Sequence, residues 1–173
     1  PACVTGPRHG VPWATMTQTA RGAMVRKLGE LLARRANDIA ALETRDNGKL
    51  LKEMRAQVSY APDVFNYFAG MADKIQGDTI PINKLDMLNF TLREPLGVIG
   101  IIIPWNSPMY LLAGTVAPCL AIGNTVVIKP SEHTSASALA FAEIAAEAGF
   151  PPGVVNVVTG YGHTAGDALT KHP

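Results

Sequence analysis

Apolar residues recur at helical spacing through the first part of the chain. An amphipathic helix is expected over 17–36, with leucines on one face and its charged residues off that face, namely Arg21, Arg26, Lys27, Glu30 and Arg34. Asn37 or Asp38 is a good N-cap for a second helix, which Gly48 should end in a left-handed conformation. The pattern therefore predicts two successive helices before position 48.

A third helical pattern follows, and then a change to short extended segments. The helix is expected over 51–74, where Pro62 should kink it or divide it in two; its buried side is Val58, Val64, Phe65, Phe68 and Met71. Residues 77–82 and 87–95 then resemble short strands on either side of the polar turn "NKLD". A two-stranded ribbon is the expected structure here.

The second half alternates between continuous apolar runs and small-residue helical patterns. The expected strands are "GVIGIII" (97–103), "NTVVIKP" (124–130) and "GVVNVVTG" (153–160), and the expected helices cover 108–123, 135–149 and 163–172. An unbroken apolar run such as "GVIGIII" is typical of a strand buried on both faces. This alternation predicts an α/β fold in which parallel strands form half of a doubly wound nucleotide-binding sheet. The expected boundaries are a helical part at 1–76, the ribbon at 77–95 and the half-sheet at 96–173.

Composition excludes several classes of function. Hydrophobic residues make up 47% and charged residues 17%, and 15 Lys and Arg nearly cancel 14 Asp and Glu, leaving a net charge of +1. We therefore expect no nucleic-acid partner and no membrane partner. Cys3 and Cys119 have no metal-ligand spacing, so neither a metal site nor a disulfide framework is expected. With no apolar run that could span a bilayer and no signal-peptide pattern, the expected location is cytoplasmic.

Polar residues with chemical potential follow each predicted strand, where open α/β sheets bind ligands. The first strand ends in "PWN", and two interpretations of Asn106 remain open. It caps the next helix, or its amide donates to an oxyanion that develops during acyl transfer. Cys119 is mid-helix among apolar residues and is interpreted as an inert small hydrophobe. The four histidines have no visible partner and are interpreted as surface or loop residues: His9, His133, His163 and His172.

The second and third strand ends carry "KPSE" and "TGYGHTAG". Lys129 and Glu132 could bind a ribose together, with the carboxylate disfavouring a 2′-phosphate; the alternative is a surface lysine followed by a helix-capping Ser131. Gly160, Gly162 and Gly166 have the spacing G-x-G-x-x-x-G, one residue longer than the usual dinucleotide fingerprint. They either admit a cofactor to a helix N-terminus or form a plain tight turn.

Three segments together resemble one known family. "EPLGVIGIIIPWNSP", "APCLAIGNTVVIKPSE" and "AGFPPGVVNVVTGYGHTAG" resemble, in order and spacing, the N-terminal part of the NAD(P)-dependent aldehyde dehydrogenase superfamily. "LETRDNGKLLKE" resembles that family's helical lead-in, so the resemblance covers nearly the whole chain. It implies an aldehyde dehydrogenase-like fold with a modified Rossmann mode of cofactor binding, and a place for the ribbon at 77–95 in an oligomerisation domain.

The resemblance also implies roles for particular residues. Asn106 matches the oxyanion-hole asparagine. The positions implied to bind the cofactor are Ile102, Ile103, Pro104 and Trp105 near the nicotinamide, Lys129, Ser131 and Glu132 near the adenosine ribose, and Gly162 and Gly166 near the adenine and pyrophosphate. Because Glu132 would repel a 2′-phosphate, NAD is preferred to NADP. Ser107 departs from the family, many of whose members have an aromatic residue after "PWN".

The activity implied for the full-length enzyme is oxidation of an aldehyde to a carboxylic acid with NAD(P)⁺, through a cysteine thiohemiacetal and thioester. The implied partners are a small-molecule aldehyde and further copies of the chain, as a dimer or tetramer. The residues given stop at Pro173, before the family's nucleophilic Cys and general-base Glu, so these 173 residues alone are expected to be inactive. The alternative is a truncated chain that binds a nucleotide or a partner without catalysis.

Overall fold

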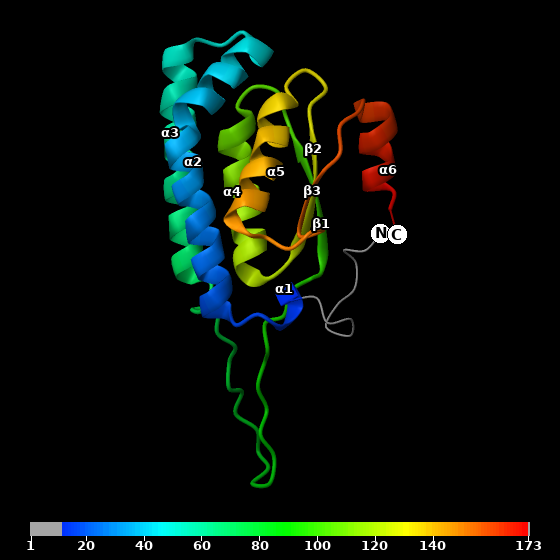
Figure 1. The fold of residues 1–173 in the computed structure, drawn as a ribbon. Coiled ribbons are helices and arrows are strands. Elements are labelled where there is room, and N and C mark those ends of the chain that lie inside the picture. Colours follow the sequence, from blue (N-terminus) through cyan, green and yellow to red (C-terminus); the bar gives the residue numbers. More distant parts are fainter. Residues whose placement is uncertain (1–11, 173) are drawn as a thin grey trace.

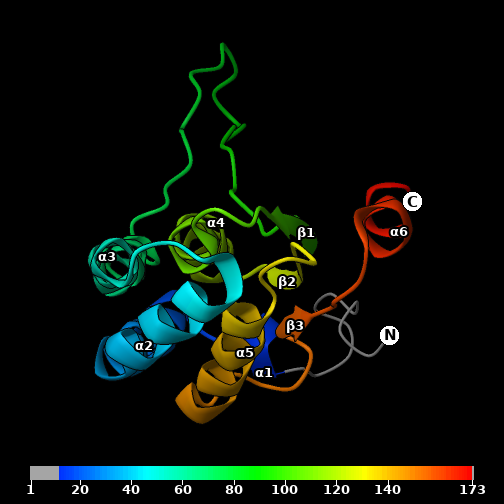
Figure 2. The same ribbon diagram turned by 90° about the horizontal axis from the view of Figure 1, so that it is seen from above.

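The computed structural model describes residues 12–172, which form layers of helices on a three-stranded sheet (Figures 1 and 2). Helices α2 (Gln18–Asn47) and α3 (Leu51–Met71) make the outer layer, and α4 (Pro108–Ile122) and α5 (Ala136–Ala148) lie between them and the sheet. The short helix α1 (Pro12–Thr15) precedes α2. No helix within 12–172 is long and apolar enough to cross a membrane.

The sheet has the expected parallel topology. Its strands are β1 (Val98–Ile103), β2 (Thr125–Pro130) and β3 (Val155–Val157), in the order β1-β2-β3. The register pairs Val98 with Thr125 and Ile103 with Pro130, so both longer strands end together. After β3, a π-helical turn η2 (Gly162–Gly166) leads into α6 (Asp167–Thr170), on the opposite face of the sheet from α4 and α5 (Figure 2). The predicted α/β half-sheet is confirmed.

The predicted break at Asn37 or Asp38 is wrong, because α2 is one helix of 30 residues. It begins after Thr17, whose hydroxyl accepts from the Ala20 amide at 3.3 Å, and ends at Gly48 with φ 73°. Ile39 and Ala40 are buried in phase with the leucines before them, so the apolar face is continuous through the break that was expected. A capping residue is only compatible with a helix start and does not impose one.

Of the two outcomes predicted at Pro62, a kink or a division of the third helix, the division is wrong. Helix α3 is continuous through the buried Pro62, and it ends at Met71 instead of position 74. Small residues let α2 approach α3 closely: a Cβ built on Gly22 would lie 2.7 Å from the Ala69 carbonyl oxygen. A Cβ on Gly29 would likewise lie 3.2 Å from the Pro62 carbonyl oxygen, so the close packing against α2 includes the position where the sequence of α3 would interrupt it.

The predicted ribbon is reduced to a single bridge. Thr79 and Phe90 form an isolated antiparallel bridge, flanked by hydrogen bonds from Ile80 N to Asn89 O (2.8 Å) and from Thr91 N to Asp78 O (2.9 Å). The segment extends away from the body as a long narrow loop (Figure 1). Within residues 12–172, no third strand and no helix covers an apolar face of this segment, and an isolated pair of extended segments is marginally stable.

The sequence predicted that strand β1 is buried on both faces, and this prediction is wrong. Ile101 and Ile103 face the helices and are buried, whereas Ile102 on the other face is 51% exposed. The only cover on that second face among the described residues comes from the C-terminal segment, where the Leu169 side chain lies against Gly100. The half-sheet therefore leaves apolar surface open.

Two side chains, one from α1 and one from the start of α2, fix these helices to the end of α4. The sequence placed Arg21 on an exposed face, but it is buried and its Nε donates to the Ala121 carbonyl at 2.9 Å. Burial lowers the pKa of this guanidinium. The Trp13 indole Nε1 donates to the Gly123 carbonyl at 3.0 Å. A charged residue off the leucine stripe is thus buried because it satisfies carbonyls at a helix end.

Candidate cofactor and oxyanion site

The chemistry predicted from the sequence gathers at the carboxyl edge of the sheet, because parallel strands in register end on the same side. Lys129 and Pro130 close β2, opposite Ile102 and Ile103 of β1. The loop after β3 turns back over the end of β2 through η2.

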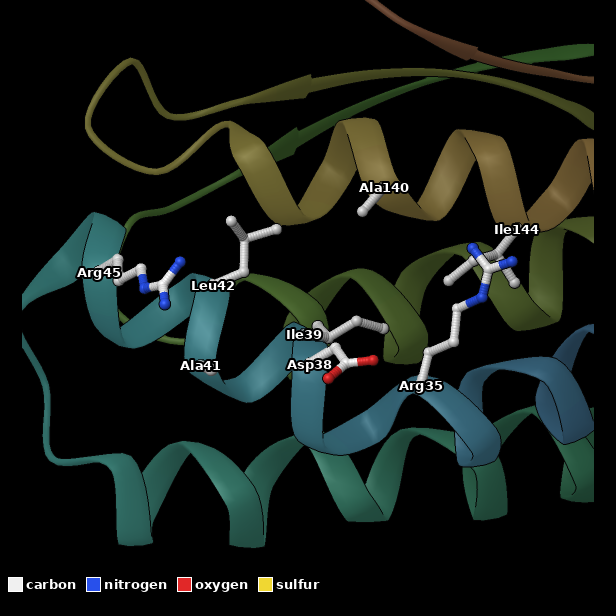
Figure 3. Close-up of a pocket in the computed structure, with 8 residues that line it drawn as sticks. All are labelled: Arg35, Asp38, Ile39, Ala41, Leu42, Arg45, Ala140 and Ile144. Carbon is white, nitrogen blue, oxygen red and sulfur yellow. The ribbon is translucent and has the colours of Figure 1, made fainter.

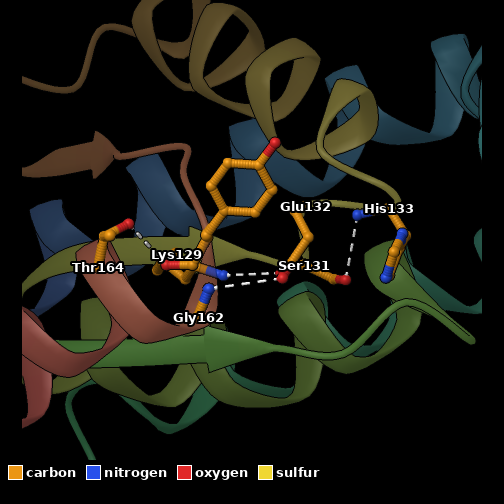
Figure 4. A network of polar contacts seen from close by, with 7 residues as sticks. Lys129, Ser131, Glu132, His133, Gly162 and Thr164 are labelled. Carbon is orange, nitrogen blue, oxygen red and sulfur yellow. Dashed lines mark hydrogen bonds and ion pairs between the residues drawn. The ribbon is translucent and has the colours of Figure 1, made fainter.

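Lys129 is a buried lysine with an ionic partner. Its side chain is 3% exposed, and its Nζ lies 3.3 Å from Glu132 Oε2 (Figure 4). The alternative of a surface lysine is therefore wrong. The capping alternative for Ser131 is wrong as well: α5 begins later, at Ala136, and the Ser131 hydroxyl instead accepts from the His133 amide at 3.3 Å. Residues 129–133 form a compact turn whose polar atoms meet one another.

Glu132 bridges the second and third strand ends. Its Oε1 accepts from the Gly162 amide at 3.5 Å, while Oε2 contacts Lys129. Hydrogen bonds from its own amide, then from Lys129 and Gly162, lower the pKa of Glu132 to about 2. The carboxylate is therefore ionised at neutral pH. Because its side chain remains 32% exposed, it can still accept hydrogen bonds from a ligand's hydroxyl groups.

The glycines after β3 are structurally distinct from one another. Gly160 has φ 147°, a conformation that L side chains rarely adopt. Gly162 is exposed, and Gly166 is buried, so that a Cβ on Gly166 would lie 4.0 Å from Lys129 Cε. The odd G-x-G-x-x-x-G spacing thus accompanies a π-helical turn that brings small residues over the Lys129 side chain.

Asn106 stands exposed in the turn between β1 and α4. Its backbone carbonyl accepts from Lys49 Nζ at 3.1 Å and from the Ser107 hydroxyl at 2.8 Å. The hydrogen bonds recorded at Asn106 use this carbonyl, which leaves the side-chain amide available to a ligand. The helix-capping alternative is wrong, because Ser107 is the N-cap residue and the Met109 amide donates to Glu43 Oε1 at 2.7 Å.

The predicted site residues thus fall into two groups at one edge. Lys129, Ser131, Glu132, Gly162 and Gly166 form one contiguous cluster. Asn106 belongs to a second group, with Lys49 and Ser107, and the structure records no contact between the two. Of the remaining four predicted residues, three are exposed and accessible to a ligand, namely Ile102, Pro104 and Trp105. Ile103 is buried.

Sequence reasoning gave no role to Glu43 and Lys49, which contact the second group. A signal was present, since Glu43 follows the buried Ile39 by one helical turn and so is an acidic residue in phase with an apolar face. Desolvation by burial raises the pKa of Glu43, opposed by the hydrogen bond from Met109. An acidic residue at such a position needs donors, and here the start of α4 provides one.

A pocket of about 450 Å³ adjoins the Asn106 turn. It lies between α3 and α4 and is lined by Ala56, Gln57, Tyr60, Ser107 and Tyr110. The rings of Tyr60 and Tyr110 are 5.7 Å apart, and Gln57 Oε1 is buried without a hydrogen-bond partner among residues 12–172. The pocket therefore combines aromatic walls with one unsatisfied acceptor.

A second pocket, of about 460 Å³, lies between α2 and α5 (Figure 3). Its lining comes from those two helices, with Arg35, Asp38 and Arg45 at its edge, and includes none of the predicted site residues. Within the described part of the chain, no group of three or more His, Cys, Asp or Glu could hold a metal ion. This pocket is a surface groove between packed helices.

Cys119 and the histidines were not among the predicted site residues, although the backbone amide of His133 donates to Ser131 of the first group. Cys119 is a half-buried free thiol whose pKa is raised by burial, which makes it a poor nucleophile. His133 and His163 are exposed, and His163 stacks on Tyr161 with ring centroids 5.5 Å apart. Cys3 and His9 lie outside the described residues.

Comparison with known proteins identifies relatives over nearly the whole chain. The model of the aldehyde dehydrogenase family matches residues 5–173. A hydroxyisobutyraldehyde dehydrogenase of Mycolicibacterium austroafricanum is 52% identical over 165 residues, and a cytosolic aldehyde dehydrogenase 1 of Elephantulus edwardii is 46% identical over 164; each match covers 94% of this chain and 32% of the relative. The crystal structure of an NAD-dependent aldehyde dehydrogenase from Sinorhizobium meliloti matches with a TM-score of 0.93 and 38% identity, over 99% of this chain and 34% of that one. The chain thus spans about a third of the length of these relatives.

Proposed function

We propose, because the chain belongs to the aldehyde dehydrogenase family, that the intact protein oxidises an aldehyde to a carboxylic acid with NAD⁺ as the hydride acceptor. The observation that carries the proposal is the composition of one sheet edge. It combines the available amide of Asn106 with an ionised Glu132 held beside a buried Lys129. Ligand binding and oxyanion stabilisation need these two kinds of group on the same side of a sheet.

The cofactor assignment is supported by the chemistry of the cluster around Lys129. Lys129 can donate to a ribose hydroxyl, Glu132 can accept from one, and Ser131 lies between them in the same turn. The exposed faces of Ile102, Pro104 and Trp105 offer an apolar surface for a nicotinamide ring. NAD⁺ bound along this edge would supply the hydride acceptor. The small residues Gly162 and Gly166 leave room for its approach.

An ionised Glu132 favours NAD over NADP. A 2′-phosphate on the adenosine ribose would bring negative charge beside this carboxylate, whose pKa of about 2 keeps it charged at neutral pH. Lys129 does not reverse this preference, because its charge is already paired with Glu132 at 3.3 Å.

Asn106 is assigned to the aldehyde oxygen. Its amide would donate to that oxygen as negative charge develops there, and the adjoining pocket at Ser107 and Tyr110 would hold the rest of the aldehyde. The nucleophile and general base implied by the family resemblance lie outside the 173 residues and belong to the intact protein. A cytoplasmic homo-oligomer, a dimer or tetramer, completes the proposal, supported by the apolar residues exposed on the loop around Thr79 and Phe90.

The first experiment measures the intact mass of the natural protein and its reduction of NAD⁺ with a panel of aldehydes. We expect a mass well above 18.3 kDa and turnover that Asn106→Ala lowers by about 10²–10³-fold, as loss of one oxyanion donor does. Asn37→Ala, an exposed asparagine on α2, is the matched control and should retain wild-type turnover. A mass of 18.3 kDa without turnover would contradict the proposal and favour the non-catalytic alternative, as would full activity in Asn106→Ala.

A further inference from the structure

We infer that Glu43 and Asp46, at the end of α2, and Lys49, just after it, are positioning residues that hold the Asn106 turn and the start of α5 in register with each other. The inference rests on the proposed function for its catalytic consequence. Its structural part stands on contacts between one helix end and two loops that follow different strands.

Glu43 fixes the start of α4. It is 1% exposed, and its Oε1 accepts from the Met109 amide at 2.7 Å, which satisfies one of the free amides in the first turn of that helix. The buried Ser137, in the first turn of α5, lies beside the same carboxyl group. Residues from both inner helices thus converge on one buried acid of the outer layer.

Lys49 fixes the turn itself. Its Nζ donates to the Asn106 carbonyl at 3.1 Å, three residues before the amide that Glu43 holds. The chain leading to Lys49 is constrained, because Gly48 adopts φ 73° and Asn47 Oδ1 accepts from the Lys49 amide at 2.9 Å. The segment from Asn106 to Met109 is therefore held at its two ends by Lys49 and Glu43, which are six residues apart in "ETRDNGK".

Asp46 makes a similar contact next to the turn that carries the candidate cofactor-binding residues. Its Oδ2 accepts from the Ala136 amide at 3.0 Å, at the first residue of α5. The turn that carries Lys129, Ser131 and Glu132 leads directly into this helix start. One helix end therefore contacts the loops after β1 and after β2, which supply the two groups of the candidate site.

Fixing the Asn106 carbonyl and the Met109 amide matters because oxyanion stabilisation depends on where the Asn106 side-chain amide lies. A displacement of about 1 Å at a reacting group can lower a rate by about 100-fold. Asn106 itself is exposed and is not enclosed by packing in the described residues. Its position is therefore set by the carbonyl and amide contacts from α2.

The test uses the intact protein with Lys49→Met, Lys49→Arg, Glu43→Ala and Glu43→Gln. Lys52→Met, an exposed lysine on α3, is the matched control. We expect Lys49→Met and Glu43→Ala to lower kcat by about 10- to 100-fold while KM for the aldehyde changes less than about 3-fold. Lys49→Arg and Glu43→Gln keep the donor or acceptor and should recover most of kcat, and Lys52→Met should match the wild type.

A second readout does not depend on turnover. Amide hydrogen exchange in the segment 104–112 should accelerate in Lys49→Met and Glu43→Ala, and remain at the wild-type rate in the conservative variants and in Lys52→Met. Unchanged exchange in both disruptive variants would overturn the inference whatever the activity. Faster exchange with unchanged kcat would overturn its catalytic part. If the wild type oxidises no aldehyde, the proposed function fails, and exchange alone then decides whether α2 positions this turn.

Discussion

At the scale of single residues, the site depends on a carboxylate whose charge is stabilised by its surroundings. Hydrogen bonds from its own amide, Lys129 and Gly162 lower the pKa of Glu132 from 4.5 to about 2. For a carboxylate with a lowered pKa, the stabilising contacts are complete above the unfolded value and are lost as pH falls toward the folded value. The charge on Glu132 should thus be constant above pH 4.5.

Glu132→Gln should weaken the preference of the intact protein for NAD over NADP by about 10- to 100-fold, because the repulsion of a 2′-phosphate is removed. The measurement is the ratio of the two Kd values by titration calorimetry at several pH values above 4.5. Above about pH 7, where a 2′-phosphate is fully ionised as well, the wild-type ratio should not vary. Glu53→Gln, an exposed acid on α3, is the control. Equal affinity of the wild type for both cofactors would refute the role given to Glu132.

Glu43 should show the opposite pH dependence. Burial raises its pKa above 4.5, so the folded protein binds this proton more tightly than the unfolded chain does. The contribution to stability is therefore greatest at low pH and declines as pH rises through the raised pKa. In Glu43→Gln, an acceptor for the Met109 amide remains without a titrating charge. The Tm of the variant relative to the wild type should rise with pH above 4.5, and a constant difference between the two would contradict this.

The sequence could identify residues that belong to a local motif. It could not identify properties that depend on contacts with distant parts of the chain. Asn106, Lys129 and Glu132 were selected as candidates because strand ends collect functional groups and the family motifs are specific. That Lys129 is buried could not be read from "KPSE", because burial comes from the turn after β3, thirty residues further along the chain. Glu43 carried a periodicity signal but no local partner, and its partner Met109 is 66 residues away.

At the scale of elements, the type of each helix and strand in the second half was predictable, and errors occurred where packing overrides local preference. Proline and a capping asparagine indicated breaks in the first half, yet α2 and α3 are both continuous, because each lies along the other over most of its length. The prediction of a two-stranded ribbon was wrong for the converse reason, because packing was absent within residues 12–172. Its alternating pattern predicts strands, but the described residues provide no neighbouring element for them to pack against.

The close contact of α2 with α3 predicts a large difference between two glycine substitutions. Gly22→Ala would place a Cβ 2.7 Å from the Ala69 carbonyl oxygen, so we expect it to destabilise the intact protein by about 1–3 kcal/mol. Gly70→Ala, in α3, meets nothing within 4 Å and should be neutral or stabilise by up to about 1 kcal/mol, because alanine favours a helix. Thermal unfolding of the two variants checks this. Equal Tm values would show that the helices can separate without penalty.

At the scale of the whole molecule, the second face of the half-sheet is only partly covered, by η2 and α6. This explains both the apolar surface on β1 and the loss of the predicted double burial. Val98 and Ile102 on β1 are 39% and 51% exposed, and Leu85 and Leu88 on the long loop are 110% and 74% exposed. Relatives three times as long have room for elements that would cover such surfaces. The topology could be predicted from the sequence, because the order of strands and helices determines it. The burial of a strand face depends on which other elements pack against it.

Residues 1–173 expressed alone should therefore self-associate. Large contiguous apolar surfaces and an unpaired strand edge promote association in water, and β1 has both. Light scattering after size-exclusion chromatography should give a polydisperse mass above 18.3 kDa, and an environment-sensitive dye should bind. Leu85→Ser with Leu88→Ser should reduce association only in part, because β1 stays exposed. A monodisperse monomer that unfolds cooperatively would show that this surface needs no cover, and would remove the physical argument for a longer intact protein.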